Sequence, residues 1–323
     1  MRPHVGSISR PSLRLLVASL AVVGLLRLVT ACGSGGSSGS AGGSGTSAAT
    51  TSSTASSTSG SEATTTLANG IPVPAHVVVV IEENHAAGQI IGSSSAPYLN
   101  TLARSGANFT ESFAITHPSQ PNYLALFSGS TQGVTDDSCP PPGSPYAKAN
   151  LAAGLVAAGK TFTGYSEDLP STGSTTCGAG DYARKHNPWV DFSNVPASAN
   201  QPFTAFRSTN YAQLPTVSVV VPNLQHDMHD GTVQEADTWL KQYLGGYADW
   251  AMDHDSLFIV TWDEDDDTPL NRIPTIFVGP MVKAGNYATH ITHYDVLRTI
   301  EDMYGVTPTG QAATATAITS VWK

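Results

Sequence analysis

The chain has 323 residues, and its 25 Asp and Glu outnumber its 15 Lys and Arg, which gives a formal net charge of −10 at pH 7. An acidic chain of this kind has no broad electrostatic attraction for nucleic acid or for an anionic bilayer, so the charge argues against nucleic acid as a partner. The length left after the N-terminal segments described next suits a single globular domain.

Residues 1–31 are predicted to be a signal peptide of the lipoprotein type. Three Arg and no acid precede an apolar run, which is interrupted by Arg27 and ends in "VTAC". The run is short for a membrane span, so an export signal is favoured over a stable transmembrane helix. The "VTAC" ending resembles the lipobox of bacterial lipoproteins and makes Cys32 the expected site of lipidation. An ordinary secretory signal with an incidental Cys32 is the alternative.

Gly, Ser, Thr and Ala dominate residues 32–70. Such a segment buries too little apolar surface to offset its chain entropy, so we expect a flexible tether. A lipid on Cys32 followed by this tether would anchor the remaining domain, residues 71–323, at a membrane surface. The expected location is therefore outside the cytoplasm, as a cell-membrane lipoprotein or as a secreted protein.

Apolar runs alternate with helical patterns through residues 71–323. Val77 to Ile81 form a continuous β-branched run, which is typical of a central strand buried on both faces. The alternation predicts an α/β fold, a doubly wound and mostly parallel sheet with helices on both faces. We expect strands near residues 77–81, 108–116, 217–223, 255–267 and 273–282, and helices near residues 96–107, 121–130, 147–160, 232–250 and 293–305.

Two cysteines, Cys139 and Cys177, remain once Cys32 is assigned to lipid. Two thiols left over in an exported protein most often pair. We therefore expect a disulfide that cross-links the Pro- and Gly-rich segment between them, and two reduced cysteines are the alternative.

Polar side chains follow four of the predicted strands at the point where each strand ends. They are Glu82–Asn84, His117 with Ser119, the "QHDMHDG" stretch and Asp263–Asp265. Ligands bind at the carboxyl ends of the strands in sheets of this type. One acid at a strand end is readily a cap or a solvated loop, but four such clusters predict a functional site.

Carboxylate, amide and imidazole groups without cysteine suit Zn²⁺, Mg²⁺, Mn²⁺ or Ca²⁺ rather than a soft metal. Asp263 and Glu264, at the mouth of the sheet, are candidate metal ligands, whereas Asp265–Asp267 are expected to form a solvated loop. The sequence from His226 to Asp230 alternates His and Asp, which favours a ligand set or a phosphate-binding pair over a core histidine. Spacing alone does not decide which of these side chains point inward.

His293 stands beside Tyr294 at the start of the last predicted helix. It is the candidate inward-facing histidine of this region, and a helix cap is the alternative.

Ser119 lies in the stretch "THPSQPN" at the start of a predicted helix, with Pro121 in the first turn. A serine here is a natural N-cap. The same place offers free N–H groups and the positive end of the helix dipole, which stabilise a phosphate or an oxyanion. A metal at this point would activate the hydroxyl as a nucleophile. No G-x-S-x-G motif is present in residues 71–323, so an α/β-hydrolase elbow is not supported there.

Five stretches together resemble the bacterial phosphoesterase family of acid phosphatases and phospholipases C, and most closely its secreted acid phosphatases. The resemblance spans nearly all of residues 77–305 and implies an alkaline-phosphatase-like fold. The stretches are "VVVVIEENH", "APYLNTLARSGANFTESFAITHPSQPNYLALFSGSTQGVTDD", "PNLQHDMHDG", "TWDEDD" and "HYDVLRTIED".

The resemblance implies a metal site around the nucleophile. Glu83 and Asn84 match the pair that binds metal after the first strand, and Asp263 and Glu264 match the later acidic pair. The "SQPN" stretch is similar to the T-x-P-N stretch of nucleotide pyrophosphatases in the same superfamily, which places Ser119 as nucleophile and metal neighbour. Two full zinc sites are not evident, so one divalent ion of unknown identity is implied.

The resemblance also implies further site residues. His293 matches the final histidine of the superfamily, and His229 and Asp227 fall near its D-x-x-x-H ligands, although the spacing here differs. His117 would bind phosphate or protonate a leaving group. Asn122 and His226 are further candidates for substrate binding.

These residues imply an exported, metal-dependent acid phosphatase that hydrolyses phosphomonoesters through a phosphoserine intermediate. The implied partner is a phosphate-ester substrate, with a phosphoinositide or another phospholipid head group among the candidates. A phosphodiesterase of the phospholipase C type is one alternative. A surface lipoprotein that kept the fold without the chemistry is the other.

Overall fold

The computed structural model describes residues 65–67 and 69–323. The predicted signal peptide, the lipidation site Cys32 and most of the predicted tether lie outside the described residues and stay predictions. Within the part that is described, no helix is long and apolar enough to cross a membrane.

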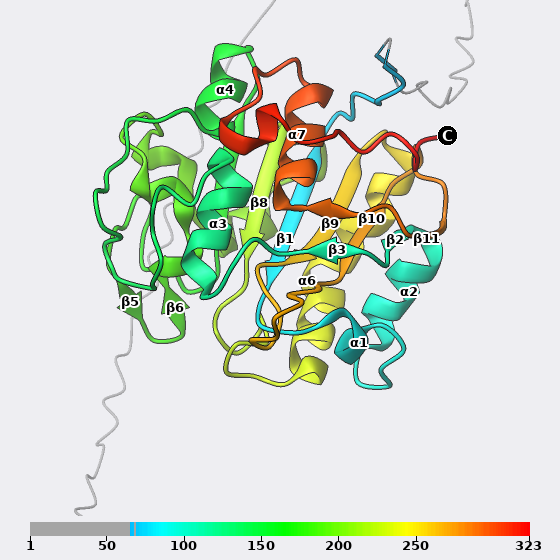
Figure 1. Cartoon of the computed structure of the whole chain (residues 1–323), viewed down its shortest axis with the longest axis horizontal. Helices are drawn as coiled ribbons and strands as arrows, with labels where there is room; N and C mark the ends of the chain where they lie inside the picture. Colours follow the sequence, from blue (N-terminus) through cyan, green and yellow to red (C-terminus); the bar gives the residue numbers. More distant parts are fainter. Residues whose placement is uncertain (1–64, 68) are drawn as a thin grey trace, which may run out of the picture. The chain divides into compact units, whose positions relative to one another are not determined.

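A sheet of eight strands forms the centre of the domain (Figure 1). Strand β10 pairs antiparallel with both of its neighbours, and the other neighbouring strands pair in parallel. The predicted mostly parallel sheet is thus confirmed. In spatial order the strands are β11 (Gly285–Tyr287), β2 (Ala107–Phe109), β10 (Thr275–Val278), β9 (Leu257–Trp262), β1 (Val77–Glu82), β8 (Val217–Val221), β4 (Phe162–Ser166) and β7 (Asn200–Pro202).

Helices cover both faces of the sheet, as a doubly wound fold requires. Val77, Val79 and Ile81 of β1 face one apolar core, which α3 and α7 complete, whereas Val78 and Val80 face a second core under α2 and α6. Figure 1 shows α3 and α7 on the side of the sheet that faces the viewer, with α4 above the upper ends of the strands. The helices are α1 (Ala87–Ile90), α2 (Pro97–Ser105), α3 (Ser119–Ser128), α4 (Leu151–Ala157), α5 (Phe203–Ser208), α6 (Val233–Asp253) and α7 (His293–Met303).

The strand expected near residues 108–116 is shorter than predicted. The chain turns after β2, and β3 (Ser112–Phe113) pairs with β12 (Ile291–Thr292) in a separate small sheet. Because β12 leads directly into α7, this small sheet joins the segment that precedes Ser119 to the start of the last helix.

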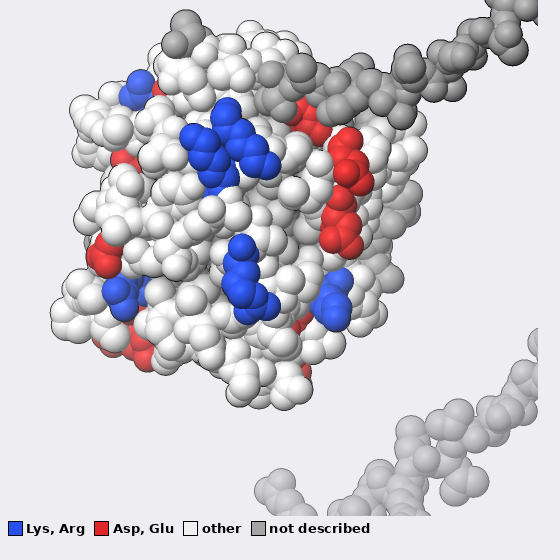
Figure 2. Space-filling view, turned by 90° about the vertical axis from the view of Figure 1, so that its right-hand side faces the viewer, with Lys and Arg blue, Asp and Glu red and all other residues white. Residues whose placement is uncertain are grey.

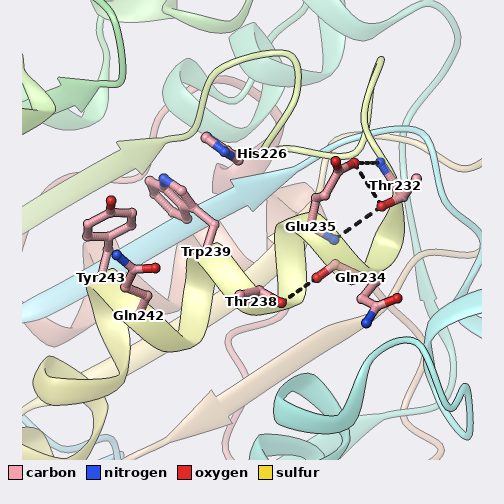
Figure 3. A pocket seen from close by; sticks show the side chains of 8 residues that line it. All are labelled: His226, Thr232, Gln234, Glu235, Thr238, Trp239, Gln242 and Tyr243. Carbon is pink, nitrogen blue, oxygen red and sulfur yellow. Dashed lines mark hydrogen bonds between the residues drawn. The ribbon is translucent and has the colours of Figure 1, made fainter.

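Helix α6 begins with a capping box in which the Thr232 hydroxyl accepts from the Glu235 N–H and the Glu235 carboxylate accepts from the Thr232 N–H. A pocket of about 500 Å³ lies along its first turns, lined by the edges of Trp239 and Tyr243 and by the ring of His226 (Figure 3). The pocket therefore lies over the helix surface rather than between the strand ends.

Charged side chains are sparse on the face drawn in Figure 2, which is the right-hand side of Figure 1. On the described part of this face, Lys and Arg form separate groups, with acidic side chains beside them and uncharged surface between. This face is therefore not a continuous basic surface.

The predicted disulfide is confirmed. Cys139 and Cys177 are bonded, with 5.7 Å between their Cα atoms. The bond joins the loop after α3 to the start of the β5–β6 hairpin (Gly178–Ala179 with Tyr182–Ala183).

Glu301 on α7 predicts a pH dependence of stability. Its side chain is fully buried, one carboxylate oxygen accepts from the Thr309 N–H and hydroxyl, and the other has no partner among the described residues. Burial raises the pKa of Glu301 from 4.5 to about 7, against the lowering effect of the two Thr309 hydrogen bonds. The folded state thus binds this proton more tightly, and the stability that results is lost as the pH rises from about 4.5 to 7.

Replacing Glu301 with Gln should remove that loss. We expect the variant to exceed the wild type in free energy of unfolding by roughly 2–3 kcal/mol at pH 8 and by little at pH 5. Urea denaturation at the two pH values measures the difference. A gain of equal size at both would show that the carboxyl charge is not its cause.

Candidate active site

Ser119 is the first residue of α3 and points into the edge of the sheet where β1 and β9 end. Its hydroxyl lies 3.0 Å from Glu83 Oε2 and 3.0 Å from Glu264 Oε1, and the side chain is 2% exposed. The interpretation of Ser119 as an N-cap is wrong, since Pro118 takes that position and makes no side-chain cap. The hydroxyl is therefore free for chemistry with the two carboxylates.

Three carboxylates crowd this hydroxyl. Burial raises the pKa of Glu83 to about 7, although His186 nearby lowers it. Burial also raises the pKa of Asp263 well above its usual range, and the charges of Glu83 and Glu264 add to the effect. Buried like charges of this kind are costly unless a cation or a proton compensates them.

The donors around Ser119 fit a hard divalent cation. One atom of the Asn84 side-chain amide lies 3.2 Å from both Glu83 Oε2 and Glu264 Oε1. As nitrogen that atom donates to both carboxylates, and as oxygen it completes a set made of oxygen atoms only. Asp263 Oδ1 accepts from the Asn84 N–H at 3.3 Å, whereas its buried Oδ2 has no partner among the described residues. Oxygen donors in this number suit Mg²⁺, Mn²⁺ or Ca²⁺, and Zn²⁺ also accepts them.

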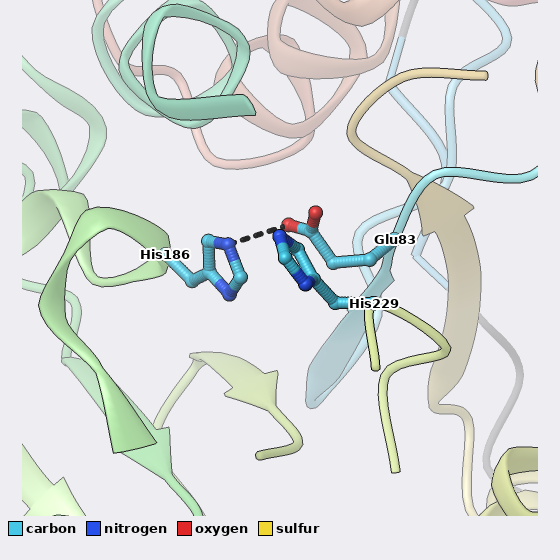
Figure 4. Close-up of side chains that lie close together, drawn as sticks. All are labelled: Glu83, His186 and His229. Atoms are coloured by element: carbon cyan, nitrogen blue, oxygen red, sulfur yellow. Dashed lines mark ion pairs between the residues drawn. The ribbon is translucent and has the colours of Figure 1, made fainter. Parts of the chain in front are cut away.

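Two imidazoles, those of His186 and His229, also lie close to the Glu83 carboxylate. Glu83, His186 and His229 each offer a ligand atom within 4.8 Å of the others, so this group also could hold a metal ion (Figure 4). His186 Nε2 lies 3.1 Å from Glu83 Oε1, and its Nδ1 lies 3.3 Å from Asp227 Oδ2. Asp227 in turn accepts from the His229 N–H at 2.8 Å. Asp227 therefore lies against the His186 ring and holds the backbone at His229.

The His186 ring is held in a closed setting. It stacks on Tyr123, with ring centroids 5.0 Å apart, and the Tyr123 hydroxyl donates to Glu83 at 2.6 Å. Burial lowers the pKa of His186 to about 4, and burial raises the pKa of Asp227 to about 8. The ring is thus neutral near pH 7, the state in which imidazole binds a metal or donates one hydrogen bond.

Comparison with known proteins identifies the family. Residues 93–307 match the Phosphoesterase family. The chain belongs to this family. The prediction of an enzyme that hydrolyses phosphate esters is thereby confirmed.

Two curated relatives show how far this phosphoesterase resembles known phosphatases. It is 52% identical over 256 residues to the phosphatidylinositol-3-phosphatase of Mycobacterium tuberculosis, covering 79% of this chain and 85% of the relative. It is 31% identical over 231 residues to the phosphate-repressible acid phosphatase of Penicillium chrysogenum, covering 66% of this chain and 55% of that protein. The chain thus spans little more than half of the fungal relative.

A solved structure supports the fold. A protein of the alkaline phosphatase superfamily from Vibrio parahaemolyticus superposes with a TM-score of 0.52 at 16% identity, covering 76% of this chain and 71% of that one. The likeness concerns the fold alone, and it confirms the alkaline-phosphatase-like architecture.

His117 of the phosphoesterase lies beside Glu264, one of the two carboxylates that face Ser119. Its Nδ1 is hydrogen-bonded to Glu264 Oε2, and its Nε2 lies 3.1 Å from the Thr268 carbonyl oxygen. Burial lowers the pKa of His117, but the bonds to Thr268 and Glu264 outweigh burial and raise it. The ring lines a pocket of about 380 Å³ together with Asn84 and Glu264, so it is the histidine of the cluster that this pocket exposes.

The expectation of a solvated loop at Asp265–Asp267 is wrong for its first member. Asp265 is 2% exposed, because its carboxylate accepts from the Thr268 and Arg272 N–H groups and folds the turn. Asp266 and Asp267 are exposed, as expected.

Asn122 is buried one turn after Ser119, where its amide holds the approach to α3. The oxygen accepts from the Ile115 and Thr116 N–H groups, and the nitrogen donates to the Thr116 and Pro118 carbonyls. All of its hydrogen-bonding capacity is used, so the structure gives Asn122 a role in positioning the backbone around His117.

Two predicted histidines have hydrogen-bond partners other than Ser119 and the carboxylates beside it. His293 is buried, and its Nε2 bonds the carbonyl of Trp262, the residue before Asp263. His226 bonds Glu167 at 2.8 Å and stacks on Trp239 in the pocket beside α6 (Figure 3). In a stretch of alternating His and Asp, only the backbone turn decides which side chain points to which pocket.

His186 and Lys185 belong to the site but were not predicted. Lys185 Nζ donates to Asp137 Oδ2 at 2.8 Å and lies 3.1 Å from His229 Nε2. Both residues come from the "ARKHNP" stretch, which lies in the long excursion between β4 and β8 rather than at a strand end. Arg184, Lys185 and His186 form a run of three basic side chains in an acidic chain, and that run is the signal that would have identified them.

Proposed function

We propose that this phosphatase of the phosphoesterase family is metal-dependent and hydrolyses phosphomonoesters through a phosphoserine at Ser119. The observation that carries the proposal is the position of the Ser119 hydroxyl, at the start of α3 and 3.0 Å from both Glu83 and Glu264. A divalent cation held by Glu83, Asn84, Ser119, Asp263 and Glu264 would lower the pKa of the hydroxyl and neutralise phosphoryl charge.

The residues of the chain supply the rest of the mechanism. Ser119 Oγ attacks phosphorus while its proton passes to Glu83 or Glu264, and the bond to the substrate alcohol breaks. His117, whose pKa is raised by its bonds to Thr268 and Glu264, would give the departing alcohol its proton. Water then attacks the phosphoserine, which releases inorganic phosphate and restores the Ser119 hydroxyl.

A phosphoinositide head group is the substrate class we propose. The support is the name of the 52% identical relative, a phosphatidylinositol-3-phosphatase. Lipidation at Cys32 and the tether of residues 32–70 remain part of this proposal, because they would hold the domain near such a substrate outside the cytoplasm.

Relative turnover of a monoester and a diester tests the proposed function. We expect p-nitrophenyl phosphate to be hydrolysed at least about tenfold faster than bis-p-nitrophenyl phosphate, a difference of about 1.4 kcal/mol in activation free energy. Release of phosphate from a short-chain phosphatidylinositol 3-phosphate should accompany it.

The diester assay separates the alternatives. Faster cleavage of the diester, together with release of phosphocholine from phosphatidylcholine, would replace the monoesterase by a phospholipase C. Absence of turnover with every added divalent ion would favour a binding protein.

A further inference from the structure

A lysine ammonium stands beside the carboxylates of the site. Lys185 Nζ has three N–H groups, of which one bonds Asp137 and a second faces His229 Nε2. The side chain is 18% exposed, and its charge lies close enough to Glu83 and Asp263 to interact with both. The third N–H group has no partner among the described residues.

Asp137 ties this ammonium to the nucleophile. Its Oδ2 accepts from Lys185, and its Oδ1 accepts from the backbone N–H of Gln120 at 2.9 Å. Gln120 directly follows Ser119 in α3. With its amide nitrogen turned toward the loop, the Gln120 side chain also donates to the carbonyls of Asp136 and Ser138, at 3.2 and 2.9 Å. The loop that carries Asp137 is thus bound to the first turn of α3 at several points.

The disulfide joins the two loops that carry this ion pair. Cys139 is two residues after Asp137. Cys177 begins the hairpin that leads to Lys185, and its carbonyl accepts from the Arg184 N–H at 3.0 Å. The loops meet across the cross-link on one side and across the Asp137–Lys185 pair on the other.

We propose that Lys185 binds the phosphate group of the substrate and that the Cys139–Cys177 disulfide positions Lys185 through Asp137. The inference rests on the proposed function, and it adds Lys185 to that same site as a phosphate-binding side chain. A phosphomonoester brings up to two negative charges toward a hydroxyl surrounded by carboxylates, and the Lys185 ammonium would add a positive charge to that of the proposed divalent cation. Arg184 does not serve in this way, because its guanidinium bonds Asp191 and the Thr175 carbonyl.

Direct phosphate binding tests the role of Lys185. Titration calorimetry of the full chain with inorganic phosphate should show binding weakened about 10- to 100-fold in Lys185→Met, the loss expected for one charge-assisted hydrogen bond. KM for p-nitrophenyl phosphate should rise more than kcat falls, and Lys185→Arg should recover part of the loss. The matched control is Lys241→Met, on the exposed surface of α6, which should bind phosphate as the wild type does.

The disulfide is tested through its coupling to Lys185. Cys139→Ser with Cys177→Ser should weaken phosphate binding in the same direction but less, and should add nothing once Lys185 is Met. If circular dichroism shows that the cysteine variant does not fold, phosphate binding by Asp137→Asn tests the same positioning of Lys185. Full additivity of the cysteine and Lys185 variants would overturn the positioning role.

The two proposals fail in different ways. Phosphate binding unchanged in Lys185→Met would overturn the inference, whatever the activity of the wild type. A wild type that binds phosphate through Lys185 but hydrolyses no phosphate ester would leave the inference standing and overturn the proposed function.

Discussion

Replacement of Ser119 by Ala is expected to lower kcat on p-nitrophenyl phosphate by roughly 10⁴-fold or more. The Ser119 hydroxyl is the attacking group in the proposed mechanism. Among the described side chains, the Tyr123 hydroxyl is the other one that is hydrogen-bonded to these carboxylates, through Glu83. Tyr123 is a poor substitute, because burial raises the pKa of its phenol well above the ordinary value. Steady-state kinetics measures the loss. Brief incubation of the wild type with ³²P-labelled substrate, followed by acid quenching, should label Ser119.

A buried serine on the same helix is the matched control. Ser128, at the far end of α3, is 2% exposed and donates to the Leu124 carbonyl at 2.8 Å. Ser128→Ala removes a hydroxyl of similar burial without touching the site, so its kcat should stay near that of the wild type. Full activity in Ser119→Ala would show that another atom attacks phosphorus.

The central strand and its acids were predictable because local pattern and topology agree there. The β-branched run of β1 is typical of a buried strand, and the carboxyl ends of parallel strands lie at one edge of the sheet, where β1 and β9 end side by side. Glu83, Asn84, Asp263 and Glu264 follow from these two facts, and the structure places them around Ser119. The positions of these residues depend on the geometry of the sheet, and the hydrophobic pattern of the sequence predicts that sheet directly.

The other half of the site depends on contacts that periodicity does not report. Lys185 and His186 lie in a short 3₁₀ helix, and their places are set by a hairpin, a disulfide and bonds to Asp137 and Asp227. These are long-range interactions between loops, and no repeat of two or 3.6 residues marks them.

Some polar residues that the sequence suggests for the site show that residue type alone does not establish a role in binding. Asn122 has the right chemistry for a site, yet the structure commits its amide to backbone carbonyls and N–H groups, whereas the buried His293 keeps one ring nitrogen, Nδ1, without a partner among the described residues. Residue type identifies a side chain that can bind a ligand, but only its partners in the fold decide whether it is free to do so.

Replacement of Asp263 by Asn is expected to change activity and stability in opposite directions. Asp263 is 1% exposed, and its pKa is raised by burial and by the neighbouring Glu83 and Glu264. Removing one of these buried charges should raise the free energy of unfolding in chelator at pH 8 by roughly 1–2 kcal/mol. The same change removes a ligand of the proposed cation, so kcat/KM with added metal should fall by about 100-fold or more.

Metal linkage separates this effect from a general loss of structure. A divalent ion at 100 times its Kd should stabilise the wild type by about 2.7 kcal/mol, whereas Asp263→Asn should gain little from the same ion. Asp267→Asn is the matched control, because Asp267 is an exposed acid that lines the pocket beside His117 and its φ of 65° is one that Asn adopts readily. That variant should keep both the metal-induced stabilisation and the activity. Equal stabilisation of wild type and Asp263→Asn by every divalent ion would place the cation elsewhere, with the Glu83, His186 and His229 group as the next site to test.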